Sequence, residues 1–244
     1  MTGWLAIAGL GPGAEGLVTP EVACALHEAT DVVGYIPYVA RIAPRPGLQL
    51  HASDNRVEMN RARHALLLAA AGRRVVVVSS GDPGVFAMAS AVFEALEAAP
   101  QWQSLDIRVL PGITAMLAAA ARAGAPLGHD FCAVNLSDNL KPWEIIETRL
   151  RLAARADFAM AFYNPRSASR PDGFRRVLDL LRQDCGPDRL ITFARAVTTP
   201  EERIETVTLA EARPEMADMR TVVLVGNSAT RRVGRWVYTP RSAG

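Results

Sequence analysis

Short β-rich runs alternate with amphipathic helical segments along almost the whole chain, and this alternation constrains the fold more than any other feature. Apolar runs predict strands at 4–10, 31–35, 75–79, 106–110, 131–136, 157–163, 189–194 and 221–226. Segments with helical periodicity lie near 20–29, 56–71, 85–98, 113–123, 142–155 and 171–184. Strands that alternate with helices in this way predict an α/β fold of packed layers.

The run Val75–Val78 has no apolar–polar alternation, which is typical of a strand covered on both faces in a parallel sheet. At 244 residues the chain is long enough for two compact halves. Pro111-Gly112 closes the strand at 106–110 and precedes an alanine-rich helical segment. We therefore predict two α/β domains, residues 1–112 and residues 113–244.

The composition indicates a folded, soluble protein without a targeting segment. Half of the residues are apolar, yet no run of apolar residues is long enough to span a membrane, and no basic leader precedes the apolar run at Trp4. We expect a cytoplasmic protein with no membrane association. The net charge of +2 and the lack of a basic cluster with interleaved aromatics argue against nucleic-acid binding.

The cysteines and histidines do not form a metal site or a disulfide framework in the sequence. Cys24, Cys132 and Cys185 are far apart and form no CxxC pair. The four histidines show neither HxH nor HExxH spacing. We expect no bound metal ion.

Arginine supplies nearly all of the positive charge. Among the 27 basic residues Lys141 is the one lysine. Arginine binds carboxylates through two parallel hydrogen bonds, so a ligand with many carboxylates would suit this chain. A genomic composition that favours arginine codons explains the same bias.

Glycine-bearing turns follow three of the predicted strands, at the edge of an α/β sheet where ligands bind. They are GLGPGAEG (9–16), SSGDPG (79–84) and PGITA (111–115). Because parallel strands end at one edge, we expect the three turns to form one backbone surface. In the second turn, Asp82 is suited to accept hydrogen bonds from a ligand's amino or hydroxyl groups, or to cap the next helix.

The first turn matches the GxGxxG pattern of dinucleotide-binding folds, but its context does not. A dinucleotide site needs a helix directly after the turn and an acidic residue after the second strand. Here Thr19 is the predicted N-cap and Pro20 the first helical residue, several positions too late, and the acidic residue Asp31 stands at the start of the second strand instead of after it. The chain also lacks the GxxxxGK[ST] sequence of a P-loop.

The three turns together resemble those of the tetrapyrrole (corrin and porphyrin) methylases, enzymes that use S-adenosylmethionine. The resemblance covers essentially the whole chain. Further segments are similar to the branch that methylates C17 of a corrin precursor and contracts the macrocycle in cobalamin biosynthesis: GYIPYV (34–39), NLSDNLKPW (135–143), FYNPRSASRP (162–171) and VGNS (225–228). The segment 53–62 departs from the expected pattern, because it lacks glycine.

The resemblance implies two domains with a cleft between them for cofactor and substrate, and a homodimer. It implies contacts with S-adenosylmethionine from Pro12, Gly81, Asp82, Val85, Thr114, Ala115, Asn164 and Ala196. Glycine allows close backbone approach, threonine offers a hydrogen bond, and the two alanines leave room beside adenine. Asn164 precedes a proline, so a turn residue explains it as well.

The implied substrate is a tetrapyrrole, with many carboxylates and a flat apolar face. Candidate ligands for its carboxylates are Arg61, Arg166 and Arg170, although solvated surface arginines look the same in sequence. Candidates to pack on its face are Tyr35, Tyr38 and Trp143, although core aromatics look the same too. Ring contraction requires removal of a hydroxyl proton. Asp138 and Glu58 are candidate catalytic bases, and the alternative base is a carboxylate of the substrate.

Other functions stay open at this point. A sibling enzyme that acts on another carbon or on a cobalt-bearing macrocycle would share the cofactor residues. An RNA or protein methylase, an NAD-dependent oxidoreductase and a non-catalytic carrier of a corrin intermediate are more distant alternatives.

Overall fold

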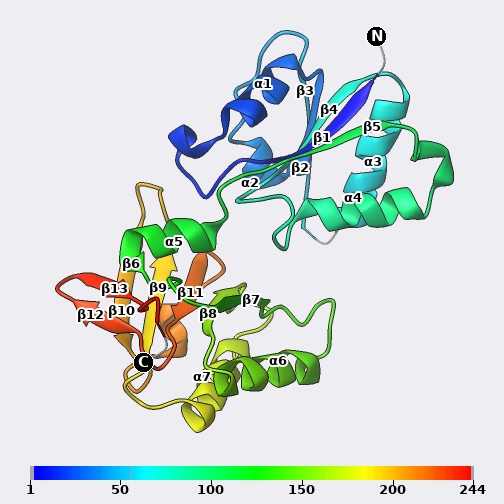
Figure 1. The fold of residues 1–244 in the computed structure, drawn as a ribbon. Helices are drawn as coiled ribbons and strands as arrows, with labels where there is room; N and C mark the ends of the chain where they lie inside the picture. The colour runs from blue at the N-terminus through cyan, green and yellow to red at the C-terminus, as the bar shows by residue number, and fades with distance from the viewer. Residues whose placement is uncertain (1–2, 56, 243–244) are drawn as a thin grey trace. The chain divides into compact units, whose positions relative to one another are not determined.

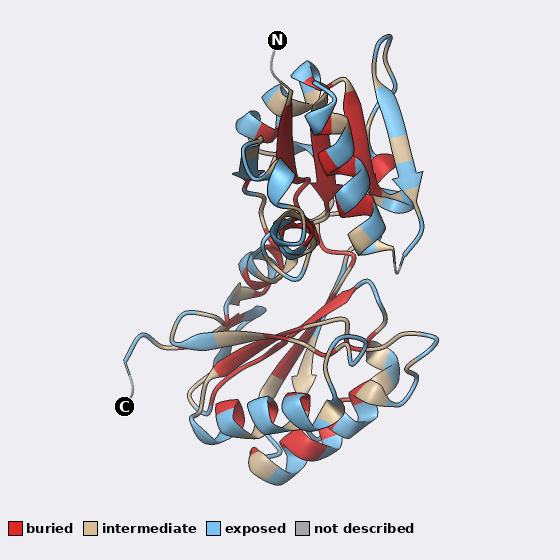
Figure 2. Cartoon of the chain, turned by 90° about the vertical axis from the view of Figure 1, so that its right-hand side faces the viewer, coloured by how far each residue is buried: buried red, intermediate tan, exposed pale blue. Residues whose placement is uncertain are grey.

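The computed structural model describes residues 3–55 and 57–242 and confirms the α/β class. The chain divides into two compact units, Met1–Thr114 (unit 1) and Ala115–Gly244 (unit 2). Each unit contains a five-stranded sheet with helices packed on it (Figure 1). Figure 2 shows that the inner strands of each sheet are buried, whereas the outer faces of the helices are exposed.

The sheet of unit 1 is entirely parallel, in the order β3-β2-β4-β1-β5. Its strands are β1 (Trp4–Gly9), β2 (Asp31–Tyr35), β3 (Gln49–Ser53), β4 (Arg74–Ser79) and β5 (Asp106–Leu110). Its helices are η1 (Glu15–Leu17), α1 (Pro20–Glu28), α2 (Ile36–Val39), α3 (Glu58–Ala70), α4 (Met88–Glu97) and η2 (Pro100–Trp102). Thr19 caps α1 by accepting a hydrogen bond from the amide of Val22 at 3.3 Å, which confirms the predicted cap.

The central strand β4 is buried on both faces, as the unbroken valine run predicts. Val75 and Val77 belong to a cluster with residues of α3 and α4, whereas Val76 and Val78 belong to a second cluster with Val22 of α1. Alternate side chains of a strand point to opposite faces, so this one run of four valines anchors helices on both sides of the sheet.

The sheet of unit 2 is mixed, in the order β10-β9-β11-β8-β7. Its strands are β7 (Phe131–Asn135), β8 (Ala159–Tyr163), β9 (Leu190–Arg195), β10 (Arg203–Thr208) and β11 (Thr221–Val225). Strands β7 and β8 are parallel, and β11 runs antiparallel to both β8 and β9. A small second sheet contains β6 (Gly124–Ala125), β12 (Arg231–Val233) and β13 (Trp236–Tyr238).

Helices cover both faces of the larger sheet of unit 2. They are α5 (Ala115–Ala123), α6 (Trp143–Arg155) and α7 (Gly173–Asp184), with a short η3 (Pro214–Met216). Helices α6 and α7 bury Ile146 and Phe174 with Phe162 of β8 in the largest core cluster. Helix α5 contributes Ala119 to a smaller cluster with Ala161 of β8.

Several predicted helix and strand boundaries differ from the structure by one to three residues, and two helix starts are examples. Helix α4 begins at Met88 instead of residue 85, because Phe86 has a left-handed backbone (φ +53°) that interrupts a helix. The helix expected over 56–71 begins at Glu58, and residue 56 lies outside the described residues. The predicted domain division at 112/113 falls in the segment that joins β5 to α5.

A buried carboxylate of β2 contacts β3 and the residue before β4 in unit 1. The side chain of Asp31, fully buried at the start of β2, accepts hydrogen bonds from Arg73 Nε (2.7 Å), Thr30 Oγ1 (2.7 Å) and His51 Nε2 (2.9 Å). Burial alone would raise the pKa of Asp31, but the hydrogen bonds from Arg73, Thr30 and His51 outweigh it and lower the pKa. Asp31 is therefore ionised in the folded protein at neutral pH.

We predict that Asp31→Asn lowers the free energy of unfolding at pH 7 by about 2 kcal/mol, because charge-assisted hydrogen bonds are lost. The lowered pKa means that the carboxylate stabilises the fold above the pKa of an unfolded aspartate, about 4, and that this contribution disappears as the pH falls further. The difference between wild type and variant in urea unfolding should therefore shrink between about pH 5 and pH 2. Equal stability at pH 7 would contradict the prediction.

Candidate active site

In unit 1, the three glycine turns meet at the carboxyl ends of neighbouring parallel strands. Gly11 and Gly81 form a two-hydrogen-bond bridge between the turns after β1 and β4, with N···O distances of 3.2 and 2.9 Å. Both have left-handed backbones, with φ of +66° and +65°. The expectation that these turns form one backbone surface is confirmed for this edge of the sheet.

Asp82 connects the second turn to the third. Its Oδ1 accepts the amide of Gly84 at 2.8 Å, and its Oδ2 accepts the amide of Gly112 at 3.1 Å. It does not cap α4, whose N-cap position is Ala87. Each carboxylate oxygen has a second lone pair, so Asp82 can hold the two loops together and still accept a hydrogen bond from a ligand.

Glycine is required at this edge for packing of backbone against backbone. A Cβ added to Gly112 would lie 2.2 Å from the carbonyl oxygen of Gly81 and 2.7 Å from that of Gly9. A Cβ added to Gly9 would lie 2.4 Å from the same oxygen of Gly81. Gly9 and Gly112 are therefore needed for contact between the turns, whereas close approach of a ligand to Gly81 stays a prediction.

Arg41, which the sequence analysis did not identify, holds the first turn. Its guanidinium donates to the carbonyl oxygens of Leu10 (2.6 Å), Gly11 (3.3 Å) and Gly13 (3.3 Å). Burial lowers the pKa of Arg41. No sequence pattern marks this role, because Arg41 lies thirty residues after the turn that it holds.

The other predicted cofactor residues of unit 1 lie on these same loops. Pro12 and Val85 are half-buried, and Thr114 is buried in the segment after β5. The amide of Val85 donates to the carbonyl of Asp82 at 3.3 Å. Next to Val85, the left-handed residue Phe86 leaves about half of its side chain exposed.

In unit 2, the predicted residues Asn164 and Ala196 lie at one edge of the sheet, directly after β8 and β9. Both strands run antiparallel to β11, so their carboxyl ends point the same way. Asn164 (φ +53°), Ala196 (φ +48°) and Thr198 (φ +66°) all have left-handed backbones. For residues other than glycine this conformation costs on the order of 1–3 kcal/mol each, and such strain is typical of functional sites.

Side chains tie the loops of this edge together. Asn164 Nδ2 donates to Asn135 Oδ1 at 3.0 Å, which links the ends of β8 and β7. Tyr163 Oη accepts the amide of Met116 at 3.0 Å and so fixes the start of α5 to the end of β8. This contact places the predicted cofactor residue Ala115 at the same edge. Asn135 and Tyr163 were not identified from the sequence.

Arg61, predicted to bind a substrate carboxylate, is 5% exposed. Its Nε donates to Ser53 Oγ at 2.8 Å, and its terminal nitrogens contact the Asp54 carbonyl (2.7 Å) and Met88 Sδ (3.4 Å). Burial lowers its pKa. These contacts join Arg61 to Ser53 and Asp54 at the end of β3, and a role as a substrate ligand stays a prediction.

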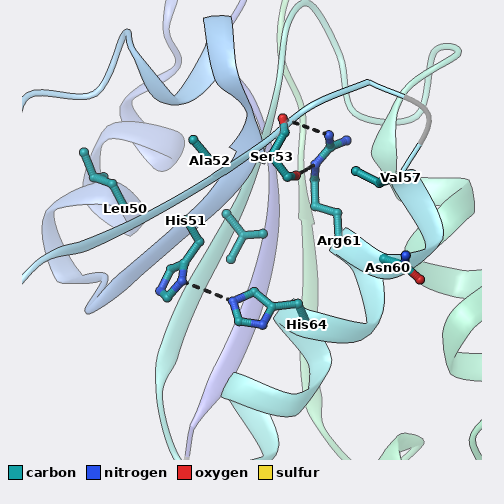
Figure 3. A pocket seen from close by; sticks show the side chains of 9 residues that line it. Leu50, His51, Ala52, Ser53, Val57, Asn60, Arg61 and His64 are labelled. Carbon is teal, nitrogen blue, oxygen red and sulfur yellow. Dashed lines mark hydrogen bonds between the residues drawn. The ribbon is translucent and has the colours of Figure 1, made fainter.

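A pocket of about 360 Å³ lies beside Arg61, between β3 and α3 (Figure 3). His51 and His64 lie next to each other in its lining, with 3.1 Å between His51 Nδ1 and His64 Nε2. Burial lowers the pKa of His64, and the neighbouring His51 lowers it further.

The predicted aromatic residues have different surroundings. Tyr35 and Tyr38 form an edge-to-face pair, 5.4 Å between ring centroids, at the carboxyl end of β2. Burial and the neighbouring Tyr35 raise the pKa of Tyr38. Trp143, at the start of α6, packs against the core of unit 2 beneath the guanidinium of Arg176, 4.0 Å from the ring centroid. Packing alone therefore accounts for Trp143.

The remaining predicted residues lie on the loops after β7 and β8. Asp138 is exposed, with its Oδ1 3.6 Å from Arg170 Nε. The Nε–H group of Arg166 donates a hydrogen bond to the Pro171 carbonyl at 3.2 Å.

Within residues 3–55 and 57–242, no group of three or more histidine, cysteine or acidic side chains is arranged to hold a metal ion. The helices in that part of the chain are too short or too polar to cross a membrane.

Comparison with known proteins decides among the families considered above. Residues 5–213 match the family model of the Tetrapyrrole (Corrin/Porphyrin) Methylases. The chain belongs to the tetrapyrrole methylase family. Among its relatives, this methylase is 51% identical to a precorrin-3B C(17)-methyltransferase from Sinorhizobium sp, over 99% of this chain and 97% of the relative. It is 37% identical to a probable cobalt-factor III C(17)-methyltransferase from Salmonella typhimurium, over 97% and 98% of the two chains.

A solved structure matches the methylase closely. The crystal structure of the methyltransferase CobJ superposes with a TM-score of 0.96 at 76% sequence identity, covering 98% of this chain and 100% of that chain. The fold with two α/β units is therefore that of a tetrapyrrole methylase.

We predict that Gly112→Ala destabilises the methylase by about 1–3 kcal/mol, because the new Cβ overlaps backbone oxygens that cannot move independently. Gly16→Ala is the matched control, since a Cβ at Gly16 meets no atom within 4 Å. Urea unfolding of both variants measures the difference. If the two variants were equally stable, the packing role of Gly112 would be wrong.

Proposed function

We propose that this methylase transfers a methyl group from S-adenosylmethionine to C17 of precorrin-3B and contracts the macrocycle, giving precorrin-4 in cobalamin biosynthesis. The observation that carries this proposal is the 51% identity to a precorrin-3B C(17)-methyltransferase over 99% of this chain. Such coverage includes both sheet edges described above. The same C17 position is named in the more distant Salmonella relative.

The residues at the two edges fit S-adenosylmethionine chemically. Asp82 keeps acceptor capacity for a hydroxyl or ammonium group, and Thr114 offers a short polar side chain. Ala115 and Ala196 leave room for an aromatic base. A uroporphyrin-III C-methyltransferase from Thermus thermophilus has been crystallised with S-adenyl homocysteine. We therefore assign these residues, with Pro12, Gly81, Val85 and Asn164, to the cofactor site.

When bound, the sulfonium cofactor supplies an activated methyl group and leaves as a neutral thioether. The protein then has to align the donor methyl with the carbon nucleophile at about 3–3.5 Å and exclude water. The locked loops of each unit suit this task, because alignment depends on rigid positioning groups. Ring contraction adds the removal of one hydroxyl proton, for which Asp138 and Glu58 are the proposed bases.

Two observations weigh against the dinucleotide alternative. The turn after β1 leads into η1, and α1 does not begin until Pro20. The carboxylate of Asp31 is buried at the amino end of β2, where it cannot reach a ribose at the opposite edge. The tetrapyrrole substrate follows from the family, whereas the homodimer and the cytoplasmic location stay predictions.

We expect the purified protein to transfer one labelled methyl group from S-adenosylmethionine to metal-free precorrin-3B over many turnovers. Mass spectrometry and the absorption spectrum would show a contracted ring, and repeated turnover would exclude a carrier. If no methyl were gained while S-adenosylhomocysteine still bound, a cobalt-bearing macrocycle or a sibling's carbon would be the target. Binding of NAD without S-adenosylhomocysteine would contradict the proposal.

Asp138→Asn and Glu58→Gln test the two proposed bases separately. Loss of a general base lowers kcat by about 10²–10⁴-fold, so the variant of the true base should bind substrate but contract it slowly. Single-turnover kinetics with precorrin-3B measures this effect. If both variants kept full ring-contracting turnover, neither residue would be the base, and a carboxylate of the substrate would take that role.

A further inference from the structure

Arg170 makes more contacts within the protein than its proposed role as a carboxylate ligand would require. Its side chain is 11% exposed. One terminal nitrogen donates to the carbonyl of Leu136 at 3.2 Å, and both terminal nitrogens donate to the carbonyl of Asn164 at 3.3 Å. Its Nε lies 3.6 Å from Asp138 Oδ1. All three nitrogens of the guanidinium are therefore directed at atoms of the protein.

These atoms belong to two loops that the site depends on. Leu136 is the first residue after β7, and Asp138 follows two positions later in the same loop. Asn164 is the first residue after β8 and has the strained backbone described above. Arg170 thus joins the loop that carries a candidate base to the loop that carries a candidate cofactor contact.

Arg166, four residues earlier, is bonded differently. Its Nε donates to the carbonyl of Pro171, and its terminal nitrogens have no hydrogen-bond partner among the residues that the structure describes. A guanidinium binds a carboxylate through two parallel N–H groups, and Arg166 retains such a pair. The two arginines of this loop, which look alike in sequence, therefore differ in what they can offer a ligand.

We propose that Arg170 is a positioning residue that locks the loops after β7 and β8 together, so that Asp138 and Asn164 are held for the reaction, and that Arg166 binds the substrate carboxylate. This proposal rests on the proposed function. It assigns the two arginines to separate roles.

Steady-state kinetics with precorrin-3B and labelled S-adenosylmethionine separates these roles. We expect Arg170→Gln to lower kcat by about tenfold or more while the KM for the macrocycle changes little, because an interaction that aligns reacting groups is lost. Arg166→Gln should instead raise this KM by about tenfold with kcat preserved, because uniform binding is lost. Arg170→Lys should lie between wild type and Arg170→Gln, since one ammonium cannot reach both carbonyls and the carboxylate.

A double-mutant cycle tests whether Arg170 acts through Asp138. Removing Asp138 in the Arg170→Gln background should cost less than removing it from the wild type, because the two effects overlap. Additive losses, together with a raised KM in Arg170→Gln, would show that Arg170 is itself a substrate ligand and would overturn the proposal.

Arg182→Gln is the matched control. Arg182 also binds backbone carbonyls in unit 2, those of Ala212 (2.6 Å) and Leu209 (3.4 Å), but its contacts lie outside the loops after β7 and β8. It should lower stability without changing kcat or KM. If it lowered kcat as much as Arg170→Gln, the effect of Arg170 would be general destabilisation, and the proposal would fail.

Amide hydrogen exchange keeps the test independent of the substrate. Arg170→Gln should increase exchange in residues 136–141 and 164–169 together, whereas Arg182→Gln should leave both segments protected. Unchanged protection in Arg170→Gln would overturn the positioning role. Absence of methyl transfer by the wild type would instead overturn the proposed function, so the two failures are distinguishable. Should Arg170→Gln not fold, Arg170→Lys serves for the same exchange comparison.

Discussion

The contact of the turns after β1, β4 and β5 is the constraint on which the candidate site of unit 1 depends. Gly9 and Gly112 approach the backbone of Gly81 more closely than any side chain would allow. Asp82 then joins the second and third turns through backbone amides, and Arg41 holds the first through its carbonyls. A surface made of locked backbone is well suited to align a small cofactor, because little conformational entropy remains to be lost on binding.

In unit 2, side-chain hydrogen bonds connect the loops at the edge of the sheet. Its loops contain left-handed residues that are not glycine, and polar side chains such as Asn135 and Tyr163 fix the neighbouring segments. The strain of Asn164 is sustained because its carbonyl accepts hydrogen bonds from Arg170 of the same loop and its side-chain amide donates to Asn135 at the end of β7. The loops at the sheet edge are thus held by glycine-mediated backbone contacts in unit 1 and by side-chain hydrogen bonds in unit 2.

The sequence predicted elements whose signals are local. The valine run of β4 and the Thr19 cap are examples, and the three glycine turns were located because parallel strands end at one edge. Strands β3 and β10 were missed, because QLHAS and RIETVT mix polar with apolar residues at the edges of their sheets. The left-handed Ala196 and Thr198 have no sequence signal, since tertiary contacts impose that backbone. A sequence also does not show whether a guanidinium contacts backbone carbonyls of its own chain, as those of Arg61 and Arg170 do.

The hydrogen bonds of the arginine side chains suggest a further reason for the arginine-rich composition, besides codon usage and ligand binding. Five arginines donate hydrogen bonds to backbone carbonyl oxygens at or next to the ends of strands and helices: Arg41, Arg45, Arg61, Arg170 and Arg182. A planar group with five N–H donors can bridge several carbonyls, which a single ammonium does poorly. The number of arginines in this chain therefore depends in part on how many loops are held through backbone carbonyls, and it is not by itself a measure of affinity for a polyanionic ligand.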